Sequence, residues 1–150
     1  MFSQTVEYAL RAMLCLASQN GTALTSERIA QQTQVPASYL SKVLRDLVRA
    51  QLVSSFRGPN GGFVLAHAAA QITVLQVVNA VDPIRRIARC PMNNPEHHDL
   101  CPLHRSLDDA LAHIEGVFGS TTLEKVRSLP NQASPCLLTH PTILHRRESA

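Results

Sequence analysis

Cysteine and histidine side chains are concentrated in the second half of this 150-residue chain. All seven histidines and three of the four cysteines follow residue 66. One short segment holds several side chains that can bind metals, among them Cys90, Glu96, His97, His98, Cys101 and His104. Thiolates and imidazoles bind zinc and iron–sulfur clusters. Because structural disulfides are rare in the cytosol, where we expect this chain, the segment indicates metal, cluster or thiol redox chemistry.

The segment that carries these side chains lies between two predicted helices. Thr73 is a suitable N-cap for an apolar helix that runs to about Val81, and Asp82-Pro83 ends that helix. Prolines and mixed polar residues follow, which is typical of a loop. Pro102 then begins a long helix to about Phe118, with Gly119 as its expected end. We therefore expect the cysteines and histidines in a loop between a buried helix and a long one.

The long helix carries apolar residues at heptad-like spacing. They are Leu103, Leu107, Ala110, Leu111, Ile114, Val117 and Phe118. Such a seam, late in a small chain, predicts pairing with the same helix of a second copy, and hence a homodimer. Packing of the seam against its own domain is the alternative. A short last helix begins near Thr121, where Thr121 to Glu124 fits a capping box.

The first half of the chain has the pattern of a winged helix-turn-helix. Helices are predicted from Gln4 to Ser18, with Ser3 as N-cap and Cys15 buried, and over residues 26–34. Val35-Pro36 marks a turn, and residues 37–51 form an amphipathic helix. Two short apolar segments, 52–56 and 62–65, then flank the turn sequence RGPNGG, which is typical of a β-hairpin. The expected fold is mainly α with a small β wing.

The amphipathic helix and the hairpin tip carry candidate DNA contacts. A recognition helix reads base edges in the major groove, and the side chains placed to do so are Ser38, Tyr39, Ser41, Lys42 and Arg45. At the wing tip, Arg57 can enter the minor groove, while Asn60 and Gly61 belong to a tight turn that approaches the backbone closely. Residues 1–66 hold six Lys or Arg against three acids, whereas residues 67–150 hold eight of each. The basic excess thus lies where phosphate neutralisation needs it.

Composition and motifs exclude several other classes. The net charge is +3, and 45% of the residues are hydrophobic, which is enough for a real core. No apolar stretch reaches the roughly 20 residues of a membrane span, and no signal peptide is recognisable, so a cytoplasmic protein is expected. No catalytic pattern is present: Asp108 and Asp109 are adjacent on a helix and cannot face one site. We expect a protein that is not an enzyme.

Three sequence stretches resemble the Rrf2 family of bacterial winged-helix transcription regulators. They are VEYALRAMLCLA, ERIAQQTQVPASYLSKVLRDLVRAQLVSSFRGPNGGFVLA and ITVLQVVNAVD, within residues 1–128. The resemblance implies a homodimer that binds a palindromic operator in double-stranded DNA, crossed long helices and a sensory loop before them. The expected division is a DNA-binding domain (1–66) and a sensory and dimerisation region (67–128). The tail lies outside the resemblance, and its prolines at 130, 135 and 141 predict that it is flexible (129–150). A repressor that senses iron–sulfur, nitric-oxide or redox status is expected.

The resemblance also implies ligands for a cluster. Relatives use three cysteines and a fourth ligand, either a nearby histidine or an acidic residue from the first helix of the partner. Cys90 and Cys101 match the first and last cysteines, His104 the histidine and Glu7 the acid. The middle cysteine is absent, and His97 and His98 stand in that region instead.

Several interpretations of this loop remain open. The ligand set suits a two-iron two-sulfur cluster, but two cysteines and two histidines suit zinc equally well. A metal-free switch, in which Cys90 and Cys101 form a disulfide, is a further interpretation, as is a loop without any ligand. At the level of the whole protein, the alternative is a winged helix that binds another protein and not DNA.

Overall fold

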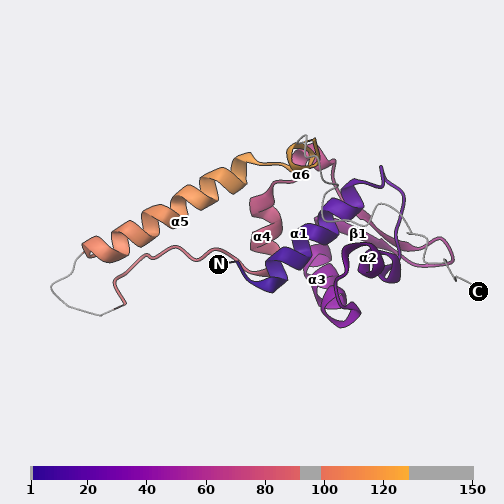
Figure 1. The fold of residues 1–150 in the computed structure, drawn as a ribbon, viewed down its shortest axis with the longest axis horizontal. Coiled ribbons are helices and arrows are strands. Elements are labelled where there is room, and N and C mark those ends of the chain that lie inside the picture. The colour runs from indigo at the N-terminus through magenta and orange to yellow at the C-terminus, as the bar shows by residue number, and fades with distance from the viewer. Residues whose placement is uncertain (1, 92–98, 129–150) are drawn as a thin grey trace, which may run out of the picture.

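The computed structural model describes residues 2–91 and 99–128, so the predicted tail and His97 and His98 lie outside the described residues. The fold is mainly helical with one small antiparallel sheet, as the sequence predicted (Figure 1). The α-helices are α1 (Gln4–Ala17), α2 (Ser26–Thr33), α3 (Ala37–Arg49), α4 (Val74–Val81), α5 (Pro102–Ser120) and α6 (Leu123–Ser128). The strands are β1 (Val53–Phe56) and β2 (Gly62–Leu65), and η1 (Ala69–Gln71) is a turn of 3-10 helix between β2 and α4.

The helix-turn-helix is held by an aliphatic core beneath α1. The Ser3 hydroxyl accepts a hydrogen bond from the Val6 amide and caps α1 as expected. Gln34 takes a left-handed conformation after α2, and buried Val35 follows it, which confirms the predicted turn. The largest fully buried side chains are Met13, Ile29, Leu40, Leu44, Leu47, Ile72 and Leu123. Contacts of α1 with α2, α3, α4 and α6 make it the central helix of this core.

Two helices end two residues away from the sequence expectation. α3 ends at Arg49, two residues early, because the chain turns there and Gln51 has a positive φ of 58°. α5 continues through Gly119 to Ser120, so the predicted stop at Gly119 was wrong. The helix ends instead where Thr121 becomes extended, since the backbone of Thr121 and Leu123 bonds to Val74 and Ile72.

The cap of the last helix is also displaced by one residue. The Thr122 hydroxyl accepts a hydrogen bond from the Lys125 amide at 3.2 Å and caps α6. Thr121, the predicted cap, uses its own hydroxyl to donate to the Val117 carbonyl oxygen at 2.8 Å. Sequence alone could not separate two adjacent threonines, because the choice depends on the strand-like pairing of Thr73 with Thr122.

The wing is anchored to the body of the domain by a third short stretch of chain. β1 and β2 pair from Val53 with Leu65 to Phe56 with Gly62. Phe63 also exchanges two backbone hydrogen bonds with Leu24, of 3.1 and 2.8 Å. A Cβ atom at Gly62 would lie 2.5 Å from the Leu24 carbonyl oxygen, so this close approach requires glycine.

The long helix α5 extends away from the winged-helix body (Figure 1). None of its 19 residues is buried within the described chain. Three of its apolar side chains are widely exposed: Leu103 by 65%, Leu107 by 48% and Val117 by 47%. No helix within residues 2–91 and 99–128 combines the length and the apolar character that a membrane crossing requires.

Candidate metal centre and nucleic-acid interface

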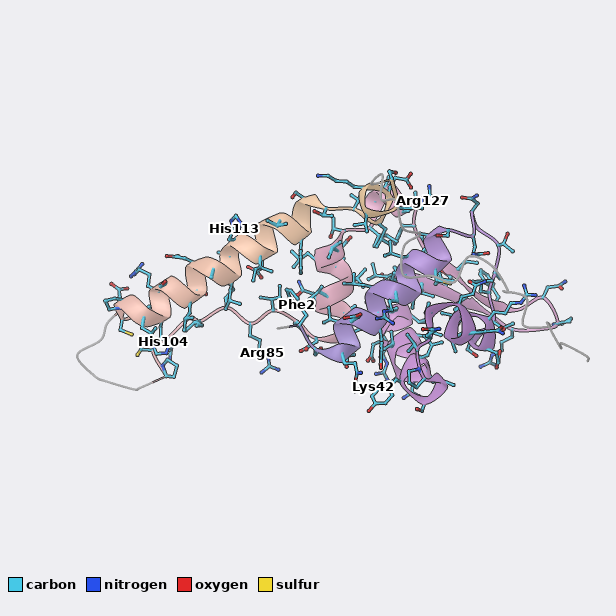
Figure 2. The ribbon with its side chains drawn as sticks, in the orientation of Figure 1. Phe2, Lys42, Arg85, His104, His113 and Arg127 are labelled. Atoms are coloured by element: carbon cyan, nitrogen blue, oxygen red, sulfur yellow. The ribbon has the colours of Figure 1, made fainter. Side chains whose placement is uncertain are left out.

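Three of the predicted ligands meet at the N-terminal end of α5. Cys90, Cys101 and His104 place one ligand atom each within 4.8 Å of one another. The Nδ1 atom of His104 lies 3.1 Å from the Cys101 sulfur and 3.6 Å from the Cys90 sulfur. All three residues are half-buried, and Figure 2 places His104 at the end of α5 that faces the loop. The structure thus brings together three of the predicted ligands, from two separate segments of the chain.

The local secondary structure explains how Cys101 and His104 converge. Cys101 is the N-cap of α5, and Pro102 fits the first helical position because it has no amide hydrogen to leave unpaired. Residues at the N-cap and three positions later lie over the same turn of a helix. The backbone amide of His104, followed by its imidazole, lowers the pKa of the Cys101 thiol to about 7. A thiol with that pKa is substantially ionised at neutral pH, and the resulting thiolate is the form that binds metals.

These three side chains fit a metal or cluster site. Two sulfurs and one imidazole nitrogen, close together and partly shielded from water, are a donor set that binds both zinc and iron. A four-coordinate site needs one further ligand. Among the described residues, no fourth His, Cys, Asp or Glu side chain joins this group.

The chain before Cys90 is attached to α5 by an ion-pair cluster that the sequence did not reveal. Arg86 donates two parallel hydrogen bonds to the carboxylate of Asp108, at 2.7 and 2.6 Å, and a third to Glu115 at 3.1 Å. The Ile87 amide donates to Asp108 as well, at 2.8 Å. The Arg86 guanidinium, and then the Ile87 amide, lower the pKa of Asp108 to about 2. We call Arg86, Asp108 and Glu115 the Arg86 clamp.

The remaining predicted ligand among the described residues, Glu7, lies elsewhere in the chain. It is an exposed residue of α1 that forms an ion pair with Arg11, one helical turn later. Arg11 also reaches the Thr33 carbonyl oxygen at the end of α2, at 3.4 Å. Glu7 is not part of the group formed by Cys90, Cys101 and His104. A role for Glu7 as a ligand therefore requires that it come from a second copy of the chain.

The predicted base-reading side chains form one exposed face of α3. Ser38, Tyr39, Ser41, Lys42 and Arg45 are all exposed, while Leu40, Val43, Leu44 and Leu47 are buried beneath them. The ring of Tyr39 packs edge-on against that of Tyr8 in α1, with centroids 5.9 Å apart. The Ser41 hydroxyl donates to the Ala37 carbonyl oxygen. The Arg49 guanidinium lies 3.7 Å from the Asp46 carboxylate, within the same helix.

The backbone at the wing tip is too crowded for a side chain at Gly61. Arg57 and Asn60 are exposed between the two strands. A Cβ atom at Gly61 would lie 2.5 Å from the Phe56 carbonyl oxygen and 2.9 Å from that of Gly58. Gly61 is thus required by the turn itself, whose closing hydrogen bond runs from the Gly61 amide to the Gly58 carbonyl oxygen at 2.9 Å.

Comparison with known proteins decides the family. The profile of the Rrf2 family, described as iron-dependent transcriptional regulators, matches residues 2–128. This chain belongs to the Rrf2 family. The HTH-type transcriptional regulator IscR of Xenorhabdus nematophila is 34% identical over 122 residues, which cover 79% of this chain and 74% of that protein. A Neisseria meningitidis protein named as an HTH-type transcriptional regulator is 31% identical over 140 residues, or 92% of this chain and 95% of that protein.

Solved structures agree with this assignment. CymR, the global cysteine regulator of B. subtilis, superposes with a TM-score of 0.72 at 28% identity, covering 87% of this chain and 98% of that one. The predicted winged-helix class is therefore confirmed. As an Rrf2 protein, the chain is a DNA-binding transcription regulator and not an enzyme. Its Cys-Cys-His group is consistent with metal or cluster binding in this family.

Proposed function

We propose that this Rrf2 protein is a cytoplasmic, homodimeric repressor that reads a palindromic operator and senses an iron–sulfur, nitric-oxide or redox signal. The observation that carries the sensory part is the convergence of Cys90, Cys101 and His104 at the start of α5. Two thiols and an imidazole from segments ten or more residues apart meet at one half-buried point. A loop without a chemical role would have no need for that arrangement.

The homodimer is supported by the exposed seam of α5. A helix that buries none of its own residues, and exposes three large apolar side chains, leaves apolar surface to be covered. Pairing with the same helix of a second copy would cover it on both chains at once, in an isologous interface. The two α3 helices would then be related by a twofold axis, which a palindromic operator mirrors.

In this proposal α3 lies in the major groove and the wing follows the adjacent minor groove. Ser38, Tyr39 and Ser41 lie near the start of α3, where base contacts are made, and Lys42 and Arg45 can reach a guanine edge or a phosphate. Arg57, Asn60 and Gly61 form the wing contact. The exposure of all the polar members of this set supports the proposal.

We propose a two-iron two-sulfur cluster as the cofactor. Cys90, Cys101 and His104 would be ligands, and the fourth would be Glu7 of the partner subunit or one of His97 and His98. Such a cluster supplies reactivity toward oxidants and nitric oxide. The three ligands hold the cluster at a half-buried position beside α5. Binding of the cluster can therefore favour one arrangement of the two subunits over another.

A metal-free thiol switch is the second candidate, because the same geometry favours it. The sulfurs of Cys90 and Cys101 lie within 4.8 Å of one another, and a disulfide requires them to approach to about 2.05 Å. The low pKa of Cys101 would make it the attacking thiolate in exchange with an oxidised disulfide donor.

Anaerobic purification with iron, sulfide and zinc analysis and a visible spectrum separates these functions. The cluster proposal predicts equal amounts of iron and sulfide and a charge-transfer spectrum that Cys90→Ala and Cys101→Ala abolish. Colourless, metal-free protein whose DNA affinity changes on oxidation would favour the thiol switch. Wild-type response to effector in both cysteine variants would overturn the sensory role of this loop.

A further inference from the structure

The extended segment before Cys90 has few attachments of its own. Ile84 packs beside Val6, Val74 and Val78, where the segment leaves α4. From residue 85 to residue 90, the hydrogen bonds to α5 that the described chain makes come from Arg86, from the Ile87 amide and from the weak Cys90–His104 contact. The Arg86 clamp therefore carries most of the polar attachment between this segment and the helix.

The clamp lies where it can fix the position of Cys90. Asp108 follows His104 by four residues, so both side chains project from the same face of α5, one turn apart. Glu115 lies two turns further along that face. Arg86 precedes Cys90 by four residues, in the segment that lies against α5. Fixing Arg86 against Asp108 thus sets where along α5 the Cys90 thiol can lie.

We propose that Arg86 is a positioning residue, which through Asp108 and Glu115 holds the Cys90 thiol beside Cys101 and His104. This inference rests on the proposed function, since it assigns Arg86 a role in building the metal centre. Asp108 is only 15% exposed and Arg86 42%, so the bidentate pair is better shielded than an ordinary surface ion pair. The planar guanidinium fork makes two parallel bonds that lysine cannot reproduce.

The neighbouring arginine supplies a matched control. Successive residues of an extended chain point to opposite sides. Figure 2 shows the Arg85 side chain directed away from α5, whereas Arg86 bonds to it. Arg85→Ala removes the same charge from the same segment without touching the clamp. Asp108→Asn removes the charge of the acceptor with little change of shape, and tests the other side of the contact.

The experiment measures two properties of the full-length protein without oxygen. The first is the dissociation constant for Co²⁺, followed by its thiolate charge-transfer absorption. We expect Arg86→Ala to bind Co²⁺ at least about tenfold more weakly than wild type, as residues that orient metal ligands do. Asp108→Asn should lose a similar factor, Arg86→Lys should lose part of it, and Arg85→Ala should match wild type.

The second property is hydrogen exchange of the Ile87 amide in metal-free protein, which does not depend on the metal. We expect at least about tenfold faster exchange in Arg86→Ala than in wild type or Arg85→Ala, with unchanged exchange in α1 and α3 as the test of folding. Equal exchange in Arg86→Ala and wild type overturns the inference, and so does equal Co²⁺ affinity. If wild type binds no Co²⁺, the iron and sulfide analysis decides the proposed metal centre, and the Ile87 exchange alone decides whether Arg86 holds this segment.

Discussion

Gly62 at the base of the wing is a position where one added methyl group should have a large effect. Its φ is 151°, and a Cβ atom there would lie 2.5 Å from the carbonyl oxygen and 2.7 Å from the carbonyl carbon of Leu24. Both are backbone atoms, so the contact cannot be relieved by rotating a side chain. In Gly62→Ala, the stretch that contains Leu24 must move away from the wing.

The size of the effect follows from what that movement breaks. Leu24 and Phe63 exchange two backbone hydrogen bonds, each of which contributes about 1 kcal/mol. An alanine at positive φ adds about 1 kcal/mol of backbone strain. We therefore expect Gly62→Ala to lower the free energy of unfolding by about 3 kcal/mol, a large fraction of the 5–15 kcal/mol typical of a domain.

Urea unfolding at a fixed protein concentration measures this loss. Gly116→Ala is the control, because Gly116 lies within α5 and a Cβ atom there meets nothing within 4 Å. That substitution should stabilise the protein by up to about 1 kcal/mol, since alanine favours a helix over glycine. A loss below about 1 kcal/mol in Gly62→Ala would refute the steric argument and the anchored wing with it.

Three further predictions test the DNA-reading face, the dimer helix and the clamp. Lys42→Ala and Arg45→Ala should each weaken operator binding by about 1–3 kcal/mol, measured by fluorescence anisotropy, whereas Arg49→Ala should change it less because Arg49 is paired within α3. Leu107→Glu places a charge on the exposed seam and should shift the protein toward monomer in analytical ultracentrifugation; an intact dimer would refute the proposed pairing. The Asp108 pKa is depressed from 3.8 to about 2, so the clamp's contribution to stability is fully present above about pH 4 and is lost as pH falls toward 2. Hydrogen exchange of the Ile87 amide, which donates to Asp108, should therefore become faster relative to its intrinsic rate as the pH falls from about 4 to about 2. A rise that begins well above pH 4 would contradict the ion pair.

The helices and the wing could be predicted from sequence because their signals are local. Ser3 and Thr73 cap helices as expected, and the glycine-rich turn RGPNGG lies between the two strands. Cys15 is 1% exposed among aliphatic neighbours, and burial raises the pKa of its thiol to about 11, as expected for a residue of the core. Local signals failed at Gly119, since glycine costs a helix only about 1 kcal/mol and the tertiary pairing after α5 decides where it ends.

The candidate metal centre marks the boundary between what sequence can and cannot predict. Cys101 and His104 share one helical turn, so their proximity follows from spacing alone. Cys90 joins them only because the preceding segment runs back along α5. Arg86 and Asp108, whose contact fixes that path, are 22 residues apart and have no periodic relation. The chemistry of the site can therefore be predicted from local motifs, whereas its proposed assembly depends on the Arg86 clamp, whose long-range ion pairs join residues that the sequence alone does not distinguish from ordinary surface charges.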